Sequence, residues 1–246
     1  MEFVPEQGKH VNGDSSTLIL LRQRELRELG IWILPMCFHA LATTHMGLFQ
    51  MASLLSLLKG RMIEFAKNLA DYVAASGKKH VVVLSSLDFG RWQRVDMSSG
   101  LQTLYLSSTN SDGTDDYCDQ LGWKKLQEYK PTQKAWKYLS ALAEGNAIPE
   151  SILPFEGELE EEEYYYPSLP FAALFSCLKA KGLKVTCLFC YCSEGDNIPD
   201  AFHLAEAACK LLDLSPSNFQ GNGNDKWVIP LSWNSVYGPP ADMSLF

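Results

Sequence analysis

Closely spaced cysteines are the residues of this sequence that most suggest chemistry. Cys187, Cys190 and Cys192 carry thiols at an interval that zinc sites use. A structural zinc site needs a second pair of ligands at suitable spacing, and the other cysteines do not supply it. In an extended strand, residues three apart point to opposite faces and lie about 10 Å apart, beyond the reach of a disulfide. We therefore expect buried, reduced thiols, with no metal and no other cofactor.

A serine, an aspartate and a histidine could form the triad of a hydrolase. Ser85 or Ser86 would be the nucleophile, with Asp88 and His203 as its partners. These serines end an apolar run that predicts a strand, and the carboxyl ends of strands carry the sites of α/β folds. However, the sequence lacks the G-x-S-x-G elbow of hydrolases, and hydroxyls at strand ends commonly cap a turn. An α/β hydrolase or nucleoside-processing enzyme is therefore the alternative interpretation.

Two other motifs lack the context that their chemistry needs. Asp88-Phe89-Gly90 spells the metal-binding triplet of protein kinases, but no glycine-rich loop, catalytic-loop motif or strand lysine accompanies it. Gly221-x-Gly223 precedes no predicted helix and lacks the third glycine of a phosphate-binding loop. We therefore predict no catalytic residue from either motif.

Helical and strand patterns alternate along the sequence around these residues, which predicts an α/β fold with a largely parallel sheet. Apolar residues at helical spacing from Met62 to Val73 predict a helix that ends at Gly77 in the left-handed conformation. The continuous apolar run His80–Ser85 predicts a strand buried on both faces. Further strands are expected from Thr17, at Leu101–Leu106 and at Leu183–Tyr191, and further helices at Tyr117–Glu128, Gln133–Glu144, Ser168–Lys181 and from Ile198.

The composition disfavours two classes of partner. The 246 residues carry a formal charge of −8, which argues against a nucleic-acid surface and against an anionic membrane surface. The apolar run Ile31–Ala42 is too short to span a bilayer. Seven irregularly spaced cysteines indicate a reducing compartment, so we expect a cytoplasmic and nuclear protein. The acidic run Glu156–Glu163 predicts a solvated loop, with a partner-binding strip as the alternative.

Aromatic residues and prolines mark the end of the sequence. Trp227 and Trp233 follow the last predicted helix, where large aromatic side chains pack back on a domain or anchor a partner. Prolines stiffen the segment from Tyr237 onward and lower the entropy cost of ordering it. An aromatic last residue with a free carboxylate suits insertion into a pocket. We therefore predict that Trp227, Trp233, Tyr237, Leu245 and Phe246 bind a partner.

Several motifs together resemble the eukaryotic proteasome assembly chaperone 2 family. They are the loop Ser193-Glu194-Gly195-Asp196-Asn197-Ile198-Pro199-Asp200-Ala201, the turn Leu121-Gly122-Trp123, the strand Val81–Ser86, and the segment Trp227–Trp233 with its Pro-Pro end. Their shared order and spacing make the resemblance strong, and it covers Met1 to about Leu20 and about Lys59 to Phe246. In the loop, Asn197 suits a helix N-cap and Pro199 an early helical position.

The resemblance implies a non-enzymatic α/β protein that pairs with proteasome assembly chaperone 1. In the family, this heterodimer lies on the outer face of the ring of proteasome α subunits, where it promotes core-particle assembly and opposes off-pathway association of α rings. In the family, C-terminal tails can dock between α subunits when their last three residues are a hydrophobic residue, a tyrosine and any residue. This chain ends Ser244-Leu245-Phe246, with leucine in place of the tyrosine, so we expect weaker docking or docking by the partner's tail.

The resemblance fails at residues 21–57. The family has there the rest of the first strand, a glycine-rich turn into the first helix, and a second strand, none of which this segment matches. Residues 30–47 look like the family's Tyr/Asp/Pro-rich stretch translated one base out of frame, which suggests a frame or splice product, and a non-functional splice isoform is therefore a further alternative. We therefore expect a disrupted first strand–helix unit within a single α/β domain over residues 17–213. A polar segment over residues 1–16 would precede this domain, and a linker and tail over residues 214–246 would follow it.

Overall fold

A six-stranded sheet forms the centre of the computed structural model, which describes residues 17–22, 47–50, 61–91, 102–149, 161–192 and 198–213. The strand order is β2-β1-β3-β6-β4-β5. The pairs β2·β1, β1·β3, β3·β6 and β4·β5 are parallel, and β4 runs antiparallel to β6. The strands are β1 (Thr17–Arg22), β2 (Gly47–Gln50), β3 (His80–Asp88), β4 (Leu104–Ser107), β5 (Lys124–Lys125) and β6 (Lys184–Cys192).

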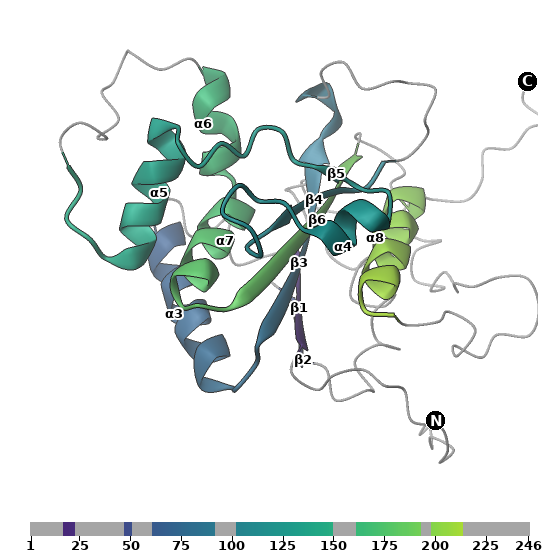
Figure 1. Cartoon of the computed structure of the whole chain (residues 1–246), viewed down its shortest axis with the longest axis horizontal. Coiled ribbons are helices and arrows are strands. Elements are labelled where there is room, and N and C mark those ends of the chain that lie inside the picture. The colour runs from purple at the N-terminus through teal and green to yellow at the C-terminus, as the bar shows by residue number, and fades with distance from the viewer. Residues whose placement is uncertain are drawn as a thin grey trace, which may run out of the picture.

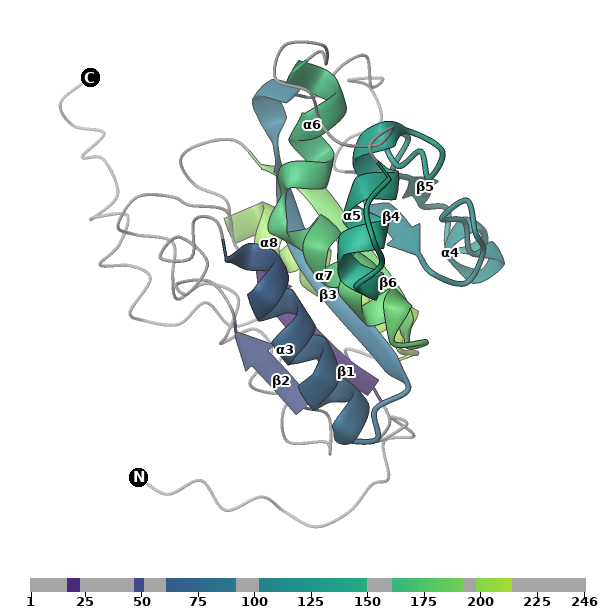
Figure 2. The same cartoon turned by 90° about the vertical axis from the view of Figure 1, so that its left-hand side faces the viewer.

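Helices cover both faces of this sheet, so the predicted α/β class with a largely parallel sheet is confirmed (Figure 1). One face carries α3 (Met62–Ala75), α5 (Lys134–Glu144), α6 (Glu161–Ser168) and α7 (Pro170–Ala180), and the other carries α8 (Ile198–Leu211) with the short α4 (Asp116–Gln120). A short 3-10 helix, η2 (Phe89–Arg91), follows β3. Figure 2 shows α7 lying along the sheet between α3 and α5.

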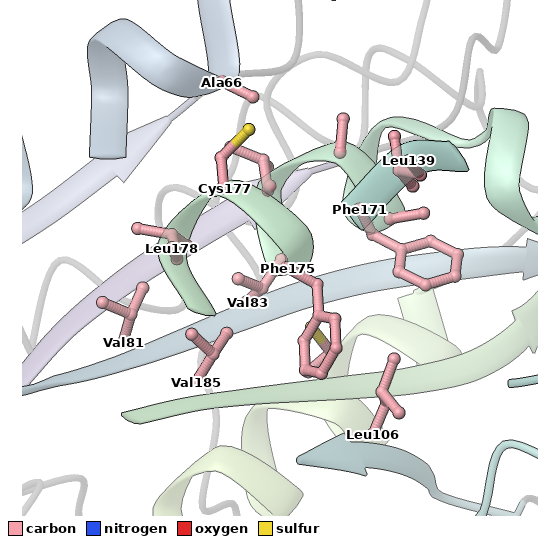
Figure 3. Close-up of a cluster of buried hydrophobic side chains, with 14 of the residues drawn as sticks. Ala66, Val81, Val83, Leu106, Leu139, Phe171, Phe175, Cys177, Leu178 and Val185 are labelled. Atoms are coloured by element: carbon pink, nitrogen blue, oxygen red, sulfur yellow. The ribbon is translucent and has the colours of Figure 1, made fainter. Parts of the chain in front are cut away.

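The larger core lies between the sheet and α7. Every residue of α7 from Pro170 to Leu178 is buried, because the helix has the sheet on one side and neighbouring helices on the others. Phe171 contacts Phe189 of β6 edge to face, with ring centroids 4.6 Å apart. Figure 3 shows the Phe175 ring of α7 extending toward the sheet, near Val185 of β6. This apolar layer explains why β3 and β6 are continuous hydrophobic runs.

A second core lies under α8. Val82, Leu84 and Cys190 point to this face of the strands and pack against Ala201, Leu204 and other residues of α8. Their neighbours Val81, Val83 and Cys187 belong to the α7 side. Successive strand residues alternate between faces, so both central strands are buried on both sides, as predicted.

Three expectations about local structure are wrong. The helix predicted over Tyr117–Glu128 ends at Gln120. The acidic run predicted as a loop enters α6 from Glu161 onward. The segment 21–57 contains β2, which pairs with β1, and β1 in turn pairs with β3 along its whole length. The strand part of the first unit is therefore present; its helix part lies outside the described residues, as do the segments 1–16 and 214–246.

Candidate functional site

The Leu121-Gly122-Trp123 turn ends α4 by a recognisable capping motif. The Gly122 N–H donates to the Asp119 carbonyl at 2.9 Å, and the Trp123 N–H donates to the Cys118 carbonyl at 3.3 Å. This is the Schellman pattern, which needs a left-handed residue after the helix, and Gly122 has φ +79°. Glycine adopts that conformation without a steric penalty. Gly122 therefore ends the helix that we had predicted to continue to Glu128. Recognising Gly122 as a C-cap glycine would have predicted this helix end from the sequence.

Asp115 fixes the other end of α4. Its Oδ1 accepts the Tyr117 N–H at 3.1 Å, and its Oδ2 accepts the hydroxyls of Ser107 at 3.0 Å and Thr109 at 2.7 Å. The Lys184 ammonium lies 3.7 Å away. Burial acts to raise the pKa of this carboxyl, but these hydrogen bonds and the ammonium lower it below its ordinary value. The carboxylate therefore stays charged and holds α4 to the ends of β4 and β6.

A cleft of about 340 Å³ separates the end of α4 from α8, which lie on the same side of the sheet (Figure 1). The turn Leu121–Trp123 forms one wall, and α8 from His203 to Lys210 forms the other. The lining residues are Gln102, Thr103, Leu121, Gly122, Trp123, Lys124, His203, Glu206, Ala207 and Lys210. Trp123 is half-buried against the α8-side core, whereas Lys124 and Lys210 are exposed. An aromatic wall with two ammonium groups at its rim suits a binding surface.

Among the described residues of this cleft, one hydroxyl contacts an imidazole ring, and that ring is His203. Its Nε2 lies 2.9 Å from the Thr103 Oγ1. Burial lowers the pKa of His203, so the ring is neutral at pH 7. A hydroxyl next to a neutral imidazole is the first half of a nucleophile–base pair, but a third group must orient the base. Among the described residues, no other side chain hydrogen bonds to this ring, and Thr103 itself is buried.

The structure separates Ser85, one of the two serines of the hydrolase alternative, from His203. Ser86 alternates with Ser85 along β3 and lies on the α8 side, but the His203 ring hydrogen bonds to Thr103 and not to Ser86. Ser85 lies on the α7 side of β3, because it follows Val81 and Val83 at alternate positions, whereas α8 with His203 covers the opposite side. The buried Ser85 hydroxyl donates to the Ser86 carbonyl at 3.4 Å. Asp88 accepts the Gly90 N–H at 3.1 Å and so caps the turn after β3. The alternative in which His203 is the base for Ser85 is therefore contradicted.

The cysteine spacing behaves as predicted. Cys187 belongs to the α7-side core and Cys190 to the α8-side core, so the two thiols point to opposite faces of β6. Cys192 is half-buried on the same side as Cys190. Within the described ranges, no group of three histidine, cysteine, aspartate or glutamate residues is placed to hold a metal ion. No helix in the same part of the chain combines the length and apolarity needed to cross a membrane.

The motif loop leads from β6 into α8. Ser193, Glu194, Gly195, Asp196 and Asn197 lie outside the described residues. Pro199 is exposed at the second position of α8, and Asp200 is half-buried in its first turn. The predicted start of this helix is thus confirmed. The motif loop and the Leu121–Trp123 turn are far apart in sequence, but both adjoin α8. The loop leads into the first turn of α8, and the Leu121–Trp123 turn faces the helix further along.

The predicted tail residues lie outside the described part of the chain. They are Trp227, Trp233, Tyr237, Leu245 and Phe246. Their role in binding a partner stays a prediction.

Comparison with known proteins identifies relatives along most of the chain. The chain is 25% identical over 196 residues to "Proteasome assembly chaperone 2" of Danio rerio, covering 77% of this chain and 64% of the relative. Proteins of the same name match from Xenopus laevis, at 26% over 82% of this chain and 70% of the relative, and from Homo sapiens, at 24% over 75% and 64%. The chain therefore spans less than two thirds of the length of the zebrafish and human relatives.

Two solved structures are also similar. One is Pyrococcus furiosus PbaA, described as an archaeal homolog of proteasome-assembly chaperone, with a TM-score of 0.36 and 15% identity over 63% of this chain and 51% of that one. The other is a protein of unknown function from Thermoplasma acidophilum, with a TM-score of 0.46 and 8% identity over 87% and 86%.

A family model covers about two thirds of the sequence. The PAC2 family model matches residues 56–220, which include the Leu121–Trp123 turn, the motif loop and α8. The match begins at the end of the segment 21–57, where the resemblance resumes, and it does not extend to residues 1–20 or to the tail. Because this family model matches more than half of the sequence, the chain belongs to the PAC2 family.

Proposed function

We propose that this protein is a proteasome assembly chaperone without catalytic activity. It pairs with proteasome assembly chaperone 1, and the pair binds the ring of proteasome α subunits, promotes core-particle assembly and opposes off-pathway association of α rings. It works in the cytoplasm and the nucleus. The observation that carries the proposal is the PAC2 family match over residues 56–220, together with the shared name of the relatives.

The arrangement of polar residues supports a binding role over an enzymatic one. Ser85 and His203 lie on opposite sides of the sheet, the His203 ring hydrogen bonds to Thr103 and not to Ser86, and the Asp88 carboxylate caps a turn. The Thr103–His203 pair lacks a hydrogen-bonded orienting group among the described residues. Catalysis by a hydroxyl nucleophile needs a nucleophile, a base and a group that orients the base, joined by hydrogen bonds. The described residues of the hydrolase alternative do not form such a set.

We place the contact with the partner on the α8 side of the sheet. Two motifs of the family resemblance gather there, one at each end of α8, and Trp123 offers a large aromatic surface at the rim of the cleft. Half-buried tryptophans are typical anchors of protein interfaces. Tyr72 of α3, 61% exposed on the other side of the sheet, provides a matched aromatic position away from this surface.

Co-expression with proteasome assembly chaperone 1 of the same organism tests the proposal. Affinity capture followed by native mass spectrometry should give a one-to-one complex that also retains α subunits. Trp123→Ala should weaken capture at least tenfold, whereas Tyr72→Ala should not, provided that both variants keep the wild-type circular dichroism spectrum. A soluble chain that captures neither partner contradicts the chaperone role. A loss caused by Tyr72→Ala alone would keep the role and move the interface to the α3 side.

Removal of Leu245 and Phe246 tests the tail separately. If the tail docks on the α ring, this truncation should reduce retention of α subunits while leaving the complex with chaperone 1 intact. Equal retention of α subunits by the truncated and full-length chains would assign ring docking to the partner.

A further inference from the structure

Two thiols lie in contact at the end of β6. Cys190 and Cys192 are two residues apart on a strand, so their side chains share the α8 side of the sheet. Their sulfur atoms are 3.6 Å apart. A disulfide needs about 2.05 Å between sulfurs and Cα atoms within about 6.8 Å. Residues two apart on a strand have Cα atoms roughly 6.6 Å apart at about 3.3 Å per residue, so closure needs only local movement.

Accessibility differs sharply between the two sulfurs. Cys190 is only 2% exposed, whereas Cys192 is half-buried. The other cysteines of the described residues, which are Cys118, Cys177, Cys187 and Cys209, are buried. Within this part of the chain, Cys192 is therefore the thiol that a dissolved oxidant reaches first, and Cys190 is the thiol poised behind it.

We propose that Cys190 and Cys192 form a reversible oxidation site, in which hydrogen peroxide converts the pair into an intramolecular disulfide. The Cys192 thiolate attacks the peroxide, so that an S–O bond forms, the O–O bond breaks and the leaving oxygen takes a proton to become water. Cys190 then loses its proton and attacks the Cys192 sulfur. The S–S bond forms, the S–O bond breaks and a second water leaves. In total, two thiols and one hydrogen peroxide give one disulfide and two waters.

The order of these steps follows from the surroundings of Cys190. Its contact with Cys192 and its burial raise the pKa of the Cys190 thiol well above the ordinary value. A protonated thiol is a poor nucleophile toward peroxide. Cys190 is thus spared direct attack, and it reacts only when an oxidised sulfur is already in contact with it.

The resulting bond should be strained and easily reduced. The estimated Cα spacing is near the upper limit for a disulfide, so closure must draw the last residues of β6 together. In the reduced state Cys192 pairs with Asp88 at the end of β3, and the Cys190 S–H donates to the Asp200 carbonyl in the first turn of α8 at 3.8 Å. Oxidation removes this donor and bends the strand where the motif loop begins. Strained disulfides are typically labile and regulatory.

Peptide mapping tests the site directly on the full-length protein. The reduced chain is treated with hydrogen peroxide, blocked with N-ethylmaleimide and digested with chymotrypsin, which cleaves after Tyr191 and so separates the two cysteines. We expect the Cys190 and Cys192 peptides to remain joined by a disulfide, and dithiothreitol to release them. In the native reduced protein, N-ethylmaleimide should label Cys192 before the buried cysteines.

Matched variants make the result specific. Cys192→Ser should abolish the linked peptides, and Cys209→Ala, which removes a buried thiol of α8, should leave them unchanged. Hydrogen exchange at the start of α8 should rise on oxidation of the wild type. Overoxidation of Cys192 while Cys190 stays reduced would overturn the proposal, as would a Cys192 disulfide to another cysteine or slow labelling of Cys192 in the native chain. None of these readouts depends on proteasome assembly.

Discussion

Replacing Asp115 with alanine should detach α4 from the sheet, because this one carboxylate holds three donors at once. Its two oxygens accept the Ser107 and Thr109 hydroxyls and the Tyr117 N–H, at distances between 2.7 and 3.1 Å. The side chain is only 7% exposed, so water does not readily replace it. Since α4 carries the Leu121–Trp123 turn, the same change should disturb the wall of the cleft.

The size of the effect follows from the groups that lose their acceptor. Loss of the N-cap contact costs about 1 kcal/mol. Each buried hydroxyl left without its charged acceptor costs about 1–3 kcal/mol. Ser107 and Thr109 hydroxyls lie 3.0 Å apart and can hydrogen bond to each other, which offsets part of that cost. We therefore expect a loss of about 3 kcal/mol in the free energy of unfolding, near the lower end of the sum of these terms.

Urea denaturation at pH 7 followed by circular dichroism measures this loss. Asp116→Ala is the matched control, since it removes a neighbouring carboxylate that is exposed in the first turn of α4, and it should change stability by about 0.5 kcal/mol or less. A loss below about 1 kcal/mol for Asp115→Ala, or equal losses for both variants, would refute the reasoning that the buried network fixes α4.

The same carboxylate predicts a dependence on pH. The pKa of Asp115 is lower in the folded chain than its unfolded value of about 3.9. The stability that it contributes is therefore fully present above about pH 4, and it is lost as the pH falls through the folded pKa. The difference in unfolding free energy between the wild type and Asp115→Ala should thus shrink below about pH 4. A constant difference down to pH 2 would contradict this assignment.

Three further predictions concern the turn after β4, the cleft and the core. Gly113→Ala should destabilise the chain by more than about 1 kcal/mol in urea denaturation, because φ is +91° and a Cβ would lie 2.6 Å from Leu106 and Tyr129 carbon atoms; a neutral result would contradict this packing. His203 should titrate below pH 6.5 in an NMR experiment, and since its folded pKa is lowered, stability should fall as the pH drops below about 6.5, a slope that His203→Gln should remove. Phe175→Ala should cost about 3–5 kcal/mol in thermal or urea denaturation, because the ring is buried between α7 and the sheet; a cost under 1 kcal/mol would show that the core is loosely packed.

Sequence patterns alone predict those helices and strands whose signals are local. Apolar periodicity located α3, α5, α7 and α8, and continuous β-branched runs located β3 and β6, because burial on one stripe or on both faces leaves a pattern in neighbouring residues. The period of two along β6 also placed Cys187 and Cys190 on opposite faces. The motifs of the resemblance led to the PAC2 family without any knowledge of contacts.

Other features of the fold arise from contacts between residues that are distant in sequence. The short β2 exists through pairing with β1, and no periodicity in its own segment predicts it. His203 of α8 contacts Thr103, 100 residues away in sequence, and only the packing of α8 on the sheet brings these two side chains together. Likewise the cleft between the Leu121–Trp123 turn and α8 arises from contacts between segments some 80 residues apart, and such contacts leave no local trace in the sequence.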